Sequence, residues 1–255
     1  MFKNLKLKKY KSLHEFEDAH VINDSSSFSM LESYKIARTN IMFSLPKTED
    51  GKIILVSSSE PGEGKTTASI NLAYTFAQSG ARVLLMDCDM RKPRVHRYLK
   101  ISKDTGLSNV LCGFCSVDEA IQKNVFGTMD CIPVGEIPLN SAELLMSDVM
   151  KNLLADLSKK YDYIFIDTPP IMTVTDAMII APMTSGVVLV ARENFSTYDM
   201  MDKTVDILRR AGVKILGFLM TYAEKSTKAR YYGKKYYSKG YRYGYKYEYK
   251  DEANK

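Results

Sequence analysis

The stretch SSSEPGEGKTT, at residues 57–67, stands between an apolar segment and a segment with helical spacing. It fits the phosphate-binding pattern G-x-x-x-x-G-K-[ST], or Walker A loop, except that Ser59 takes the place of the first glycine. Gly62 and Gly64 let the backbone curl so that successive N–H groups point at phosphate oxygens. The helix that starts at Lys65 adds the positive end of its dipole. The stretch therefore predicts a nucleoside triphosphate site.

Each residue of this loop has an expected task. Lys65 should reach the β- and γ-phosphates, and the Thr66 hydroxyl should bind Mg²⁺. The residues expected to contact the nucleotide are Pro61, Gly62, Glu63, Gly64, Lys65, Thr66 and Thr67. The structural alternative is a glycine-rich turn before a helix, and the intact Gly64-Lys65-Thr66 after a strand argues against it.

Strands and helices alternate on both sides of the loop. Short segments rich in Ile and Val, which we interpret as strands, lie at 52–57, 83–87, 163–167, 187–191 and 214–220, with a weaker one at 129–133. Helical stretches lie at 65–79, 141–160 and 198–211. Continuous apolar strands that alternate with helices indicate an α/β fold with a mainly parallel central sheet and helices on both faces. The loop makes this a P-loop NTPase fold.

Two further strands end in carboxylates. YDYIFID ends in Asp167, the Walker B position, which we expect to support Mg²⁺ directly or through water. VLLMDCDMR carries Asp87 and Asp89, which face the same side if the chain stays extended. One of them could lie beside Mg²⁺ and the other near an incoming hydroxyl, whose proton it could take. Arg91 could neutralise phosphate charge, although an acidic loop capped by Arg91 is the structural alternative.

The basic charge of the chain is concentrated in its C-terminal segment. Residues 224–255 hold ten Lys and Arg against four Asp and Glu, which accounts for the whole formal charge of +6. Within them, 231–249 read YYGKKYYSKGYRYGYKYEY, with nine tyrosines and almost no aliphatic residue. Such a segment cannot bury a core, so 223–255 should form a disordered, solvated tail.

The N-terminal region contains a basic arm and then a helix. Residues 1–28 are basic and then polar, and they predict a flexible arm. Ser29-Met30-Leu31-Glu32 fits a capping box that would start a helix at 29–45, the first element of a main domain at 29–222. No apolar run of about 18 residues could cross a bilayer, and nothing resembles a signal peptide. We therefore expect a cytosolic protein, in which the Cys112-x-x-Cys115 spacing is a pair of reduced thiols.

In this order, the motifs resemble those of the bacterial tyrosine autokinases of capsule and exopolysaccharide synthesis. The chain is similar to the form in which the cytoplasmic kinase is separate from its membrane activator. The resemblance covers about residues 29 to 219 and the tail. It rests on PGEGKTT, LLMDCDMRKP, PLNSAELL, YDYIFIDTPP, VTDA and the tyrosine cluster.

The resemblance implies an ATP- and Mg²⁺-dependent, non-specific protein-tyrosine kinase on the fold of the MinD/ParA ATPases. The implied catalytic residues are Lys65, Asp87, Asp89 and Asp167, and the implied metal ligands are Thr66, Asp87 and Asp167. Arg91 would contact the nucleotide. A neighbouring subunit would phosphorylate the tail at Tyr231, Tyr232, Tyr236, Tyr237, Tyr241, Tyr243, Tyr245, Tyr247 and Tyr249.

The resemblance also implies partners. Subunits would form a ring, such as an octamer, through an E-x-x-R-x-x-R helix, which here reads Glu32, Lys35 and Arg38. Lys35 keeps the charge of the usual arginine but lacks its bidentate fork. A transmembrane activator of the polysaccharide co-polymerase type would recruit the chain to the inner face of the plasma membrane, and a cognate tyrosine phosphatase would reverse its reaction. The family often places Asn against the nucleotide base where this chain has Thr221.

Two other functions fit parts of the sequence. The first is a positioning ATPase of the MinD/ParA type. Such an ATPase carries a signature lysine just before the position of Pro61, where this chain has the oppositely charged Glu60. A nucleic-acid-binding tail could stack tyrosines on bases and neutralise phosphates with lysines. Each phosphotyrosine adds about −1.5 to −2 charges, so nine of them would reverse a charge of +6. A tail that is switched in this way suits a phosphorylation substrate, and nucleic acid is not expected as a partner.

Overall fold

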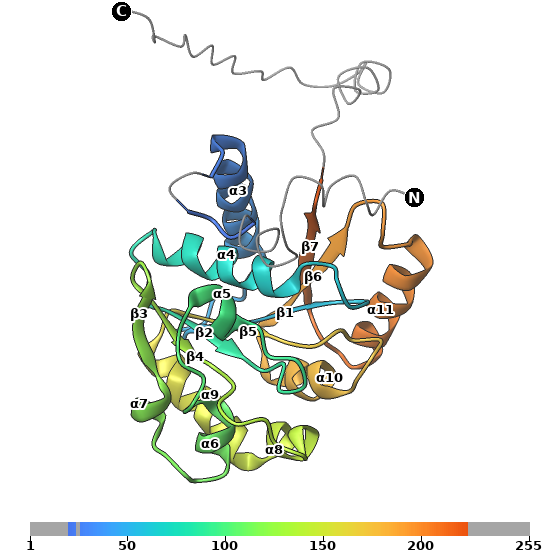
Figure 1. Ribbon diagram of the computed structural model, residues 1–255. Coiled ribbons are helices and arrows are strands. Elements are labelled where there is room, and N and C mark those ends of the chain that lie inside the picture. Colours follow the sequence, from blue (N-terminus) through green and yellow to red (C-terminus); the bar gives the residue numbers. More distant parts are fainter. Residues whose placement is uncertain (1–19, 24–25, 224–255) are drawn as a thin grey trace, which may run out of the picture. The chain divides into compact units, whose positions relative to one another are not determined.

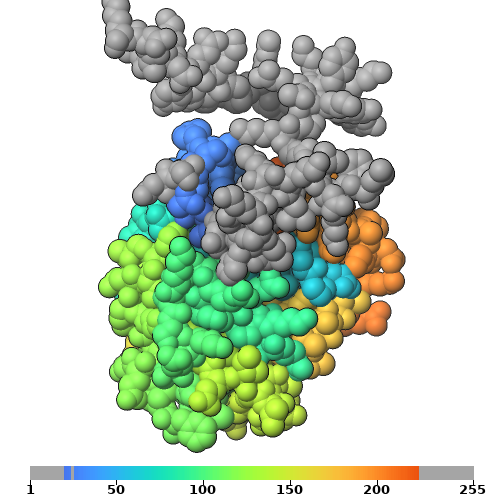
Figure 2. Space-filling view, viewed as in Figure 1, coloured from blue at the N-terminus to red at the C-terminus, as the bar shows by residue number. Residues whose placement is uncertain are grey.

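The computed structural model describes residues 20–23 and 26–223. Most of the expected N-terminal arm and nearly all of the tyrosine-rich tail, including its nine predicted phosphoacceptors, lie outside the described residues. The described residues up to Tyr222 belong to one compact unit (Figure 2).

A seven-stranded sheet forms the centre of this unit, in the order β3-β4-β2-β5-β1-β6-β7 (Figure 1). The strands are β1 (Lys52–Ser58), β2 (Val83–Asp87), β3 (Gln122–Phe126), β4 (Met129–Ile132), β5 (Tyr163–Asp167), β6 (Gly186–Arg192) and β7 (Ile215–Thr221). Neighbouring strands are parallel except β3 and β4, which are antiparallel. The predicted α/β class and mainly parallel sheet are confirmed.

Helices cover both faces of the sheet. They are α3 (Phe28–Ser44), α4 (Lys65–Ala77), α5 (Val95–Leu99), α6 (Leu107–Leu111), α7 (Val117–Ala120), α8 (Ser141–Met146), α9 (Asp148–Lys160), α10 (Asp176–Ile180), the 3₁₀ turn η2 (Ala181–Met183) and α11 (Tyr198–Arg210). Apolar residues of α3, α4 and α5 pack on one face, and those of α6, α8, α9, α10 and α11 pack on the other. Because both faces are covered, the central strands read as continuous apolar runs.

Two local predictions are wrong. The N-cap of α3 is Ser27 and not Ser29, because the Ser27 hydroxyl accepts a hydrogen bond from the Met30 N–H at 3.3 Å. Glu32 instead pairs with Lys35 one turn further on. The single helix expected at 141–160 is two helices, because Ser147 adopts an extended conformation and its hydroxyl caps the second helix.

No helix among the residues that the structure describes is long and apolar enough to cross a membrane. The two cysteines of the Cys112-x-x-Cys115 spacing are free thiols, the first exposed and the second half-buried.

Candidate active site

The phosphate loop lies between the end of β1 and the start of α4. Gly62 and Gly64 have φ angles of 85° and 88°, a left-handed conformation that favours glycine. Gly64 is the N-cap of α4 and has no side chain to occupy the first N–H groups of the helix. These N–H groups remain available for an anion, in line with the predicted phosphate site.

Two carboxylates meet beside this loop. β2 and β5 are neighbouring parallel strands, and their last residues, Asp87 and Asp167, are register partners. Both side chains are buried. The carboxylate of Asp87 accepts the N–H groups of Asp89 at 3.1 Å and Val95 at 3.2 Å. One oxygen of Asp167 accepts the hydroxyl of Ser69 at 2.9 Å.

Burial makes the charged forms of these two acids unfavourable, and Lys65 offsets this only in part. Burial raises the pKa of Asp87 well above its usual range, and repulsion from Asp167 and Asp89 adds to the effect. Burial also raises the pKa of Asp167 to about 6, although Lys65 and a hydrogen bond with Thr66 oppose the shift. Burial lowers the pKa of Lys65, which Asp167 and Asp89 partly offset. Two adjacent buried acids beside one lysine form a site that a cation would stabilise.

This donor set suits Mg²⁺. The ion is commonly held by one or two carboxylates together with substrate phosphates, and it does not require an all-protein cage. Among the described residues, no cluster of three or more His, Cys, Asp or Glu side chains could hold a metal ion without further ligands. Asp87, Asp167 and Thr66 are the residues that would hold the ion.

Arg91 does not stand free beside the phosphate loop. Its guanidinium donates two hydrogen bonds to the carboxylate of Asp176, at 2.9 and 3.0 Å. Asp176 is fully buried, and the hydroxyl of Ser141 points at the same carboxylate at 3.4 Å. Asp176, in the motif VTDA, therefore contacts residues of two other motifs, Arg91 of LLMDCDMRKP and Ser141 of PLNSAELL. The predicted contact of Arg91 with phosphate would have to coexist with this ion pair.

Some side chains at the site were not predicted. Ser69 lies one turn after Lys65 on α4, so helical spacing could have identified it. Arg192, the last residue of β6, and Ser196, shortly after it, hold the phosphate loop from 130 and 133 residues away in sequence, and no local pattern indicates them. Thr221, considered as a contact for the base, instead donates a hydrogen bond to the carbonyl of Glu63 at 2.7 Å.

The predicted assembly residues lie on α3. Lys35 and Glu32 form an exposed ion pair at 2.8 Å. Arg38 donates to the carbonyl of Thr75 on α4 at 2.7 Å and so fixes α3 to the helix that begins at the phosphate loop. The structure thus gives Arg38 a role within one subunit, and assembly through this helix remains a prediction.

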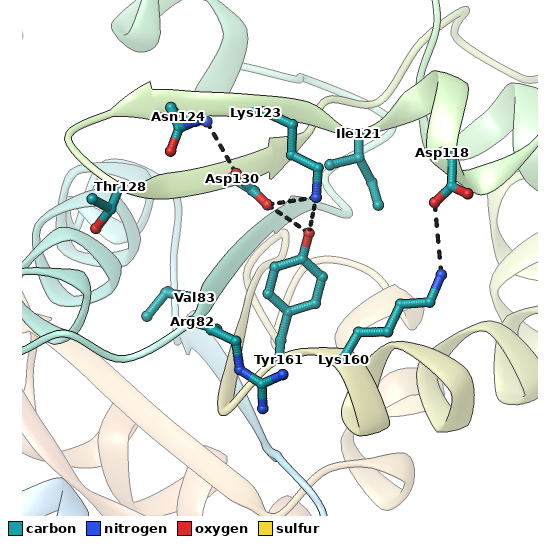
Figure 3. Close-up of a pocket in the computed structure, with 10 residues that line it drawn as sticks. All are labelled: Arg82, Val83, Asp118, Ile121, Lys123, Asn124, Thr128, Asp130, Lys160 and Tyr161. Atoms are coloured by element: carbon teal, nitrogen blue, oxygen red, sulfur yellow. Dashed lines mark hydrogen bonds and ion pairs between the residues drawn. The ribbon is translucent and has the colours of Figure 1, made fainter.

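A cavity of about 320 Å³ lies at the opposite, amino-terminal edge of the sheet (Figure 3). At its centre Lys123 donates to the carboxylate of Asp130 and to the hydroxyl of Tyr161, and Tyr161 donates to Asp130. The other cations of the cavity are also paired, Arg82 with Asp162 and Lys160 with Asp118. Since each positive charge already has an acid, this cavity has no free charge for a phosphate.

Several known proteins resemble this chain in sequence. Residues 51–211 match the family model described as an AAA domain. The chain is 38% identical to tyrosine-protein kinase YwqD of Bacillus subtilis, over 80% of this chain and 86% of that protein. It is 32% identical to the putative tyrosine-protein kinase CapB of Staphylococcus aureus, over 83% of this chain and 92% of that protein. It spans only 27% of tyrosine-protein kinase ptk of Acinetobacter johnsonii.

The fold agrees with these relationships. The kinase domain of Escherichia coli tyrosine kinase ETK superposes with a TM-score of 0.76 at 33% identity, over 88% of this chain and 84% of that chain. The cell division ATPase MinD of Pyrococcus furiosus superposes with a TM-score of 0.58 at 29% identity, over 67% of this chain and 71% of that chain.

Proposed function

The chain belongs to the family of bacterial tyrosine-protein kinases, and from this premise we propose that it transfers the γ-phosphoryl group of ATP to the tail tyrosines of neighbouring copies. The observation that carries the proposal is the position of Lys65 beside the buried Asp167, whose cross-strand partner is a second buried acid, Asp87. This transfer requires a group that binds the phosphates and a group that accepts the proton of the tyrosine hydroxyl.

The reaction can be written in terms of these residues. A tyrosine hydroxyl gives its proton to the carboxylate of Asp87, which lies at the end of β2 beside Asp167. The phenolate oxygen forms a bond to the γ-phosphorus while the bond from that phosphorus to the β–γ bridging oxygen breaks, which leaves ADP. Lys65 and the N–H groups of the phosphate loop stabilise the negative charge that gathers on the phosphates. Bound Mg²⁺ would supply further positive charge at the same oxygens.

The acceptor and the regulation belong to the same proposal. Nine phosphotyrosines would add roughly −14 to −18 charges to a tail of +6, which would loosen an assembly of copies. Assembly would use the face of α3 that carries Glu32, Lys35 and Arg38. A transmembrane activator of the co-polymerase type would hold the kinase at the inner face of the plasma membrane, where the phosphorylated state would regulate capsule or exopolysaccharide polymerisation. A tyrosine phosphatase would remove the phosphate groups from the tail.

Mass spectrometry tests the acceptor. After incubation with ATP and Mg²⁺, phosphate should appear on tyrosines within 231–249. A Lys65→Met chain should remain unlabelled alone and become labelled when wild-type protein is added. Absence of phosphotyrosine in that segment, with an activator peptide present, would overturn the proposal. Self-labelling of the Lys65→Met chain would overturn the assignment of the site.

A further inference from the structure

Glu63 is a buried acid within a loop that should hold phosphates. Its side chain is fully buried, and both carboxylate oxygens have a partner within the protein. One oxygen accepts the backbone N–H of Glu60 at 2.8 Å, and the other accepts the hydroxyl of Ser196. A negative charge beside a triphosphate disfavours binding by repulsion, so the acid requires a structural reason for its place.

The loop carbonyls around Glu63 are also anchored. Arg192 donates to the carbonyl of Gly62 at 3.0 Å, and Thr221 donates to the carbonyl of Glu63 at 2.7 Å. In a trans peptide unit the C=O and the following N–H point in opposite directions. The hydrogen bonds to these two carbonyls therefore turn the N–H groups of Glu63 and Gly64 away from Arg192 and Thr221.

The anchoring residues are themselves held in place. The N–H of Arg192 donates to the Ser196 hydroxyl at 2.7 Å, so that hydroxyl connects Arg192 to the Glu63 carboxylate. The Arg192 guanidinium also lies 4.4 Å from the ring centre of Tyr222, the residue after Thr221. The end of β6 and the end of β7 thus act together on the phosphate loop.

We infer that Glu63 is a positioning residue of the phosphate loop. Together with Arg192, Ser196 and Thr221 it forms a clamp that sets the peptide planes of the loop, so that the N–H groups of Glu63 and Gly64 face the phosphates before the nucleotide arrives. Preorganised donors of this kind bind charge without a reorganisation cost. The inference rests on the proposed nucleotide site but not on the identity of the phosphate acceptor.

Two substitutions of Glu63 distinguish the effect of its hydrogen bonds on the loop from the effect of its charge. In Glu63→Gln the amide oxygen can accept the Glu60 N–H while the amide NH₂ donates to Ser196, so the clamp survives without its charge. In Glu63→Ala the clamp is lost. Calorimetric titration of the full chain with a non-hydrolysable ATP analogue and Mg²⁺ should give a Kd about 10-fold or more above wild type for Glu63→Ala, and within about 3-fold of wild type for Glu63→Gln.

The outcomes are distinct. A folded Glu63→Ala chain that binds as wild type does would overturn the inference. Equal weakening by Gln and Ala would also overturn it, because the charge, through its effect on Lys65, would then be what matters. If Glu63→Ala does not fold, Ser196→Ala and Thr221→Val each remove one donor from outside the loop and should each raise the Kd by about 3- to 10-fold. Wild-type affinity in both of these variants would overturn the inference as well.

Ser158→Ala is the matched control. The Ser158 hydroxyl donates to the Ala155 carbonyl within α9, at the far edge of the sheet, so its loss should leave the Kd unchanged. The titration measures binding alone. The wild-type protein could prove unable to phosphorylate its tail while Glu63→Ala still binds the ATP analogue more weakly than wild type. That result would support the clamp and contradict only the proposed function.

Discussion

Asp87 and Asp167 are cross-strand partners at the carboxyl ends of β2 and β5, so the backbone ladder itself holds the two acids side by side. The N–H of Cys88 also donates to the carbonyl of Asp167 at 2.8 Å and extends the pairing beyond the acids. The mutual repulsion of these carboxylates is therefore built into the folded state, and its effects can be measured.

Asp167 should make the Mg²⁺-free protein more stable as the pH falls. Its folded pKa of about 6 lies above the unfolded value, so the folded state binds the proton more tightly and gains stability between about pH 6 and pH 4. Asp167→Asn removes this dependence and should raise the free energy of unfolding at pH 7, by at most about 3 kcal/mol. Thermal unfolding of both chains across this range, in the presence of a chelator, checks the expectation. Parallel pH profiles for the two chains would contradict it.

Ser69→Ala should reduce phosphotransfer while leaving the fold intact. The variant removes the hydroxyl that fixes one oxygen of Asp167, so the acid is held less firmly and the rate should fall about 10-fold. A single lost hydrogen bond should cost the fold about 1 kcal/mol. Ser79→Ala, which removes a comparable bond at the far end of α4, is the control and should keep the wild-type rate. Equal rates in both variants would show that Ser69 does not position Asp167.

Arg91→Ala decides between an ion pair and a phosphate contact. Loss of the guanidinium leaves the buried carboxylate of Asp176 without its charge partner, which should destabilise the fold by about 1 to 3 kcal/mol, a range reduced because Arg91 is partly exposed. Urea unfolding of Arg91→Ala, Asp176→Asn and the double variant should show that the two losses are not additive. Unchanged stability with weakened nucleotide binding would instead support the phosphate contact.

Lys35→Arg tests the assembly face of α3. The substitution restores the fork that the related motif carries, so the chain should assemble at a lower concentration than wild type. Sedimentation velocity over a series of concentrations measures the change. Arg210→Lys, a change at the far end of α11, is the control. If Lys35→Arg and wild type sediment alike at every concentration, this position has no part in assembly.

The parts of the site that could be predicted are those encoded in short stretches. The phosphate loop and the strand-end acids each combine a local motif with a local apolar run, so both the fold class and the positions of Lys65, Asp87 and Asp167 follow from the sequence. β3 was missed because Gln122, Lys123 and Asn124 lie on a half-covered edge strand and carry no apolar pattern. The break at Ser147 was missed because helical periodicity continues across it.

Contacts between segments that are far apart in the sequence could not be predicted from the sequence. Arg91 was expected to contact phosphate because it lies near two acids in the sequence. Nothing in the nearby sequence indicates that its guanidinium pairs with the carboxylate of Asp176, 85 residues away. The bond from Thr221 to Glu63 joins residues 158 positions apart. Such pairs depend on the order of strands in the sheet, which local patterns do not specify.

The clamp has a mechanical consequence. The acids cannot be separated without breaking a strand ladder, whereas the phosphate loop is fastened by side chains, one of them that of Thr221, the last residue of β7. A change in the position of that strand end would therefore reach the phosphate loop, and with it the binding of ATP, while the acids stay in place.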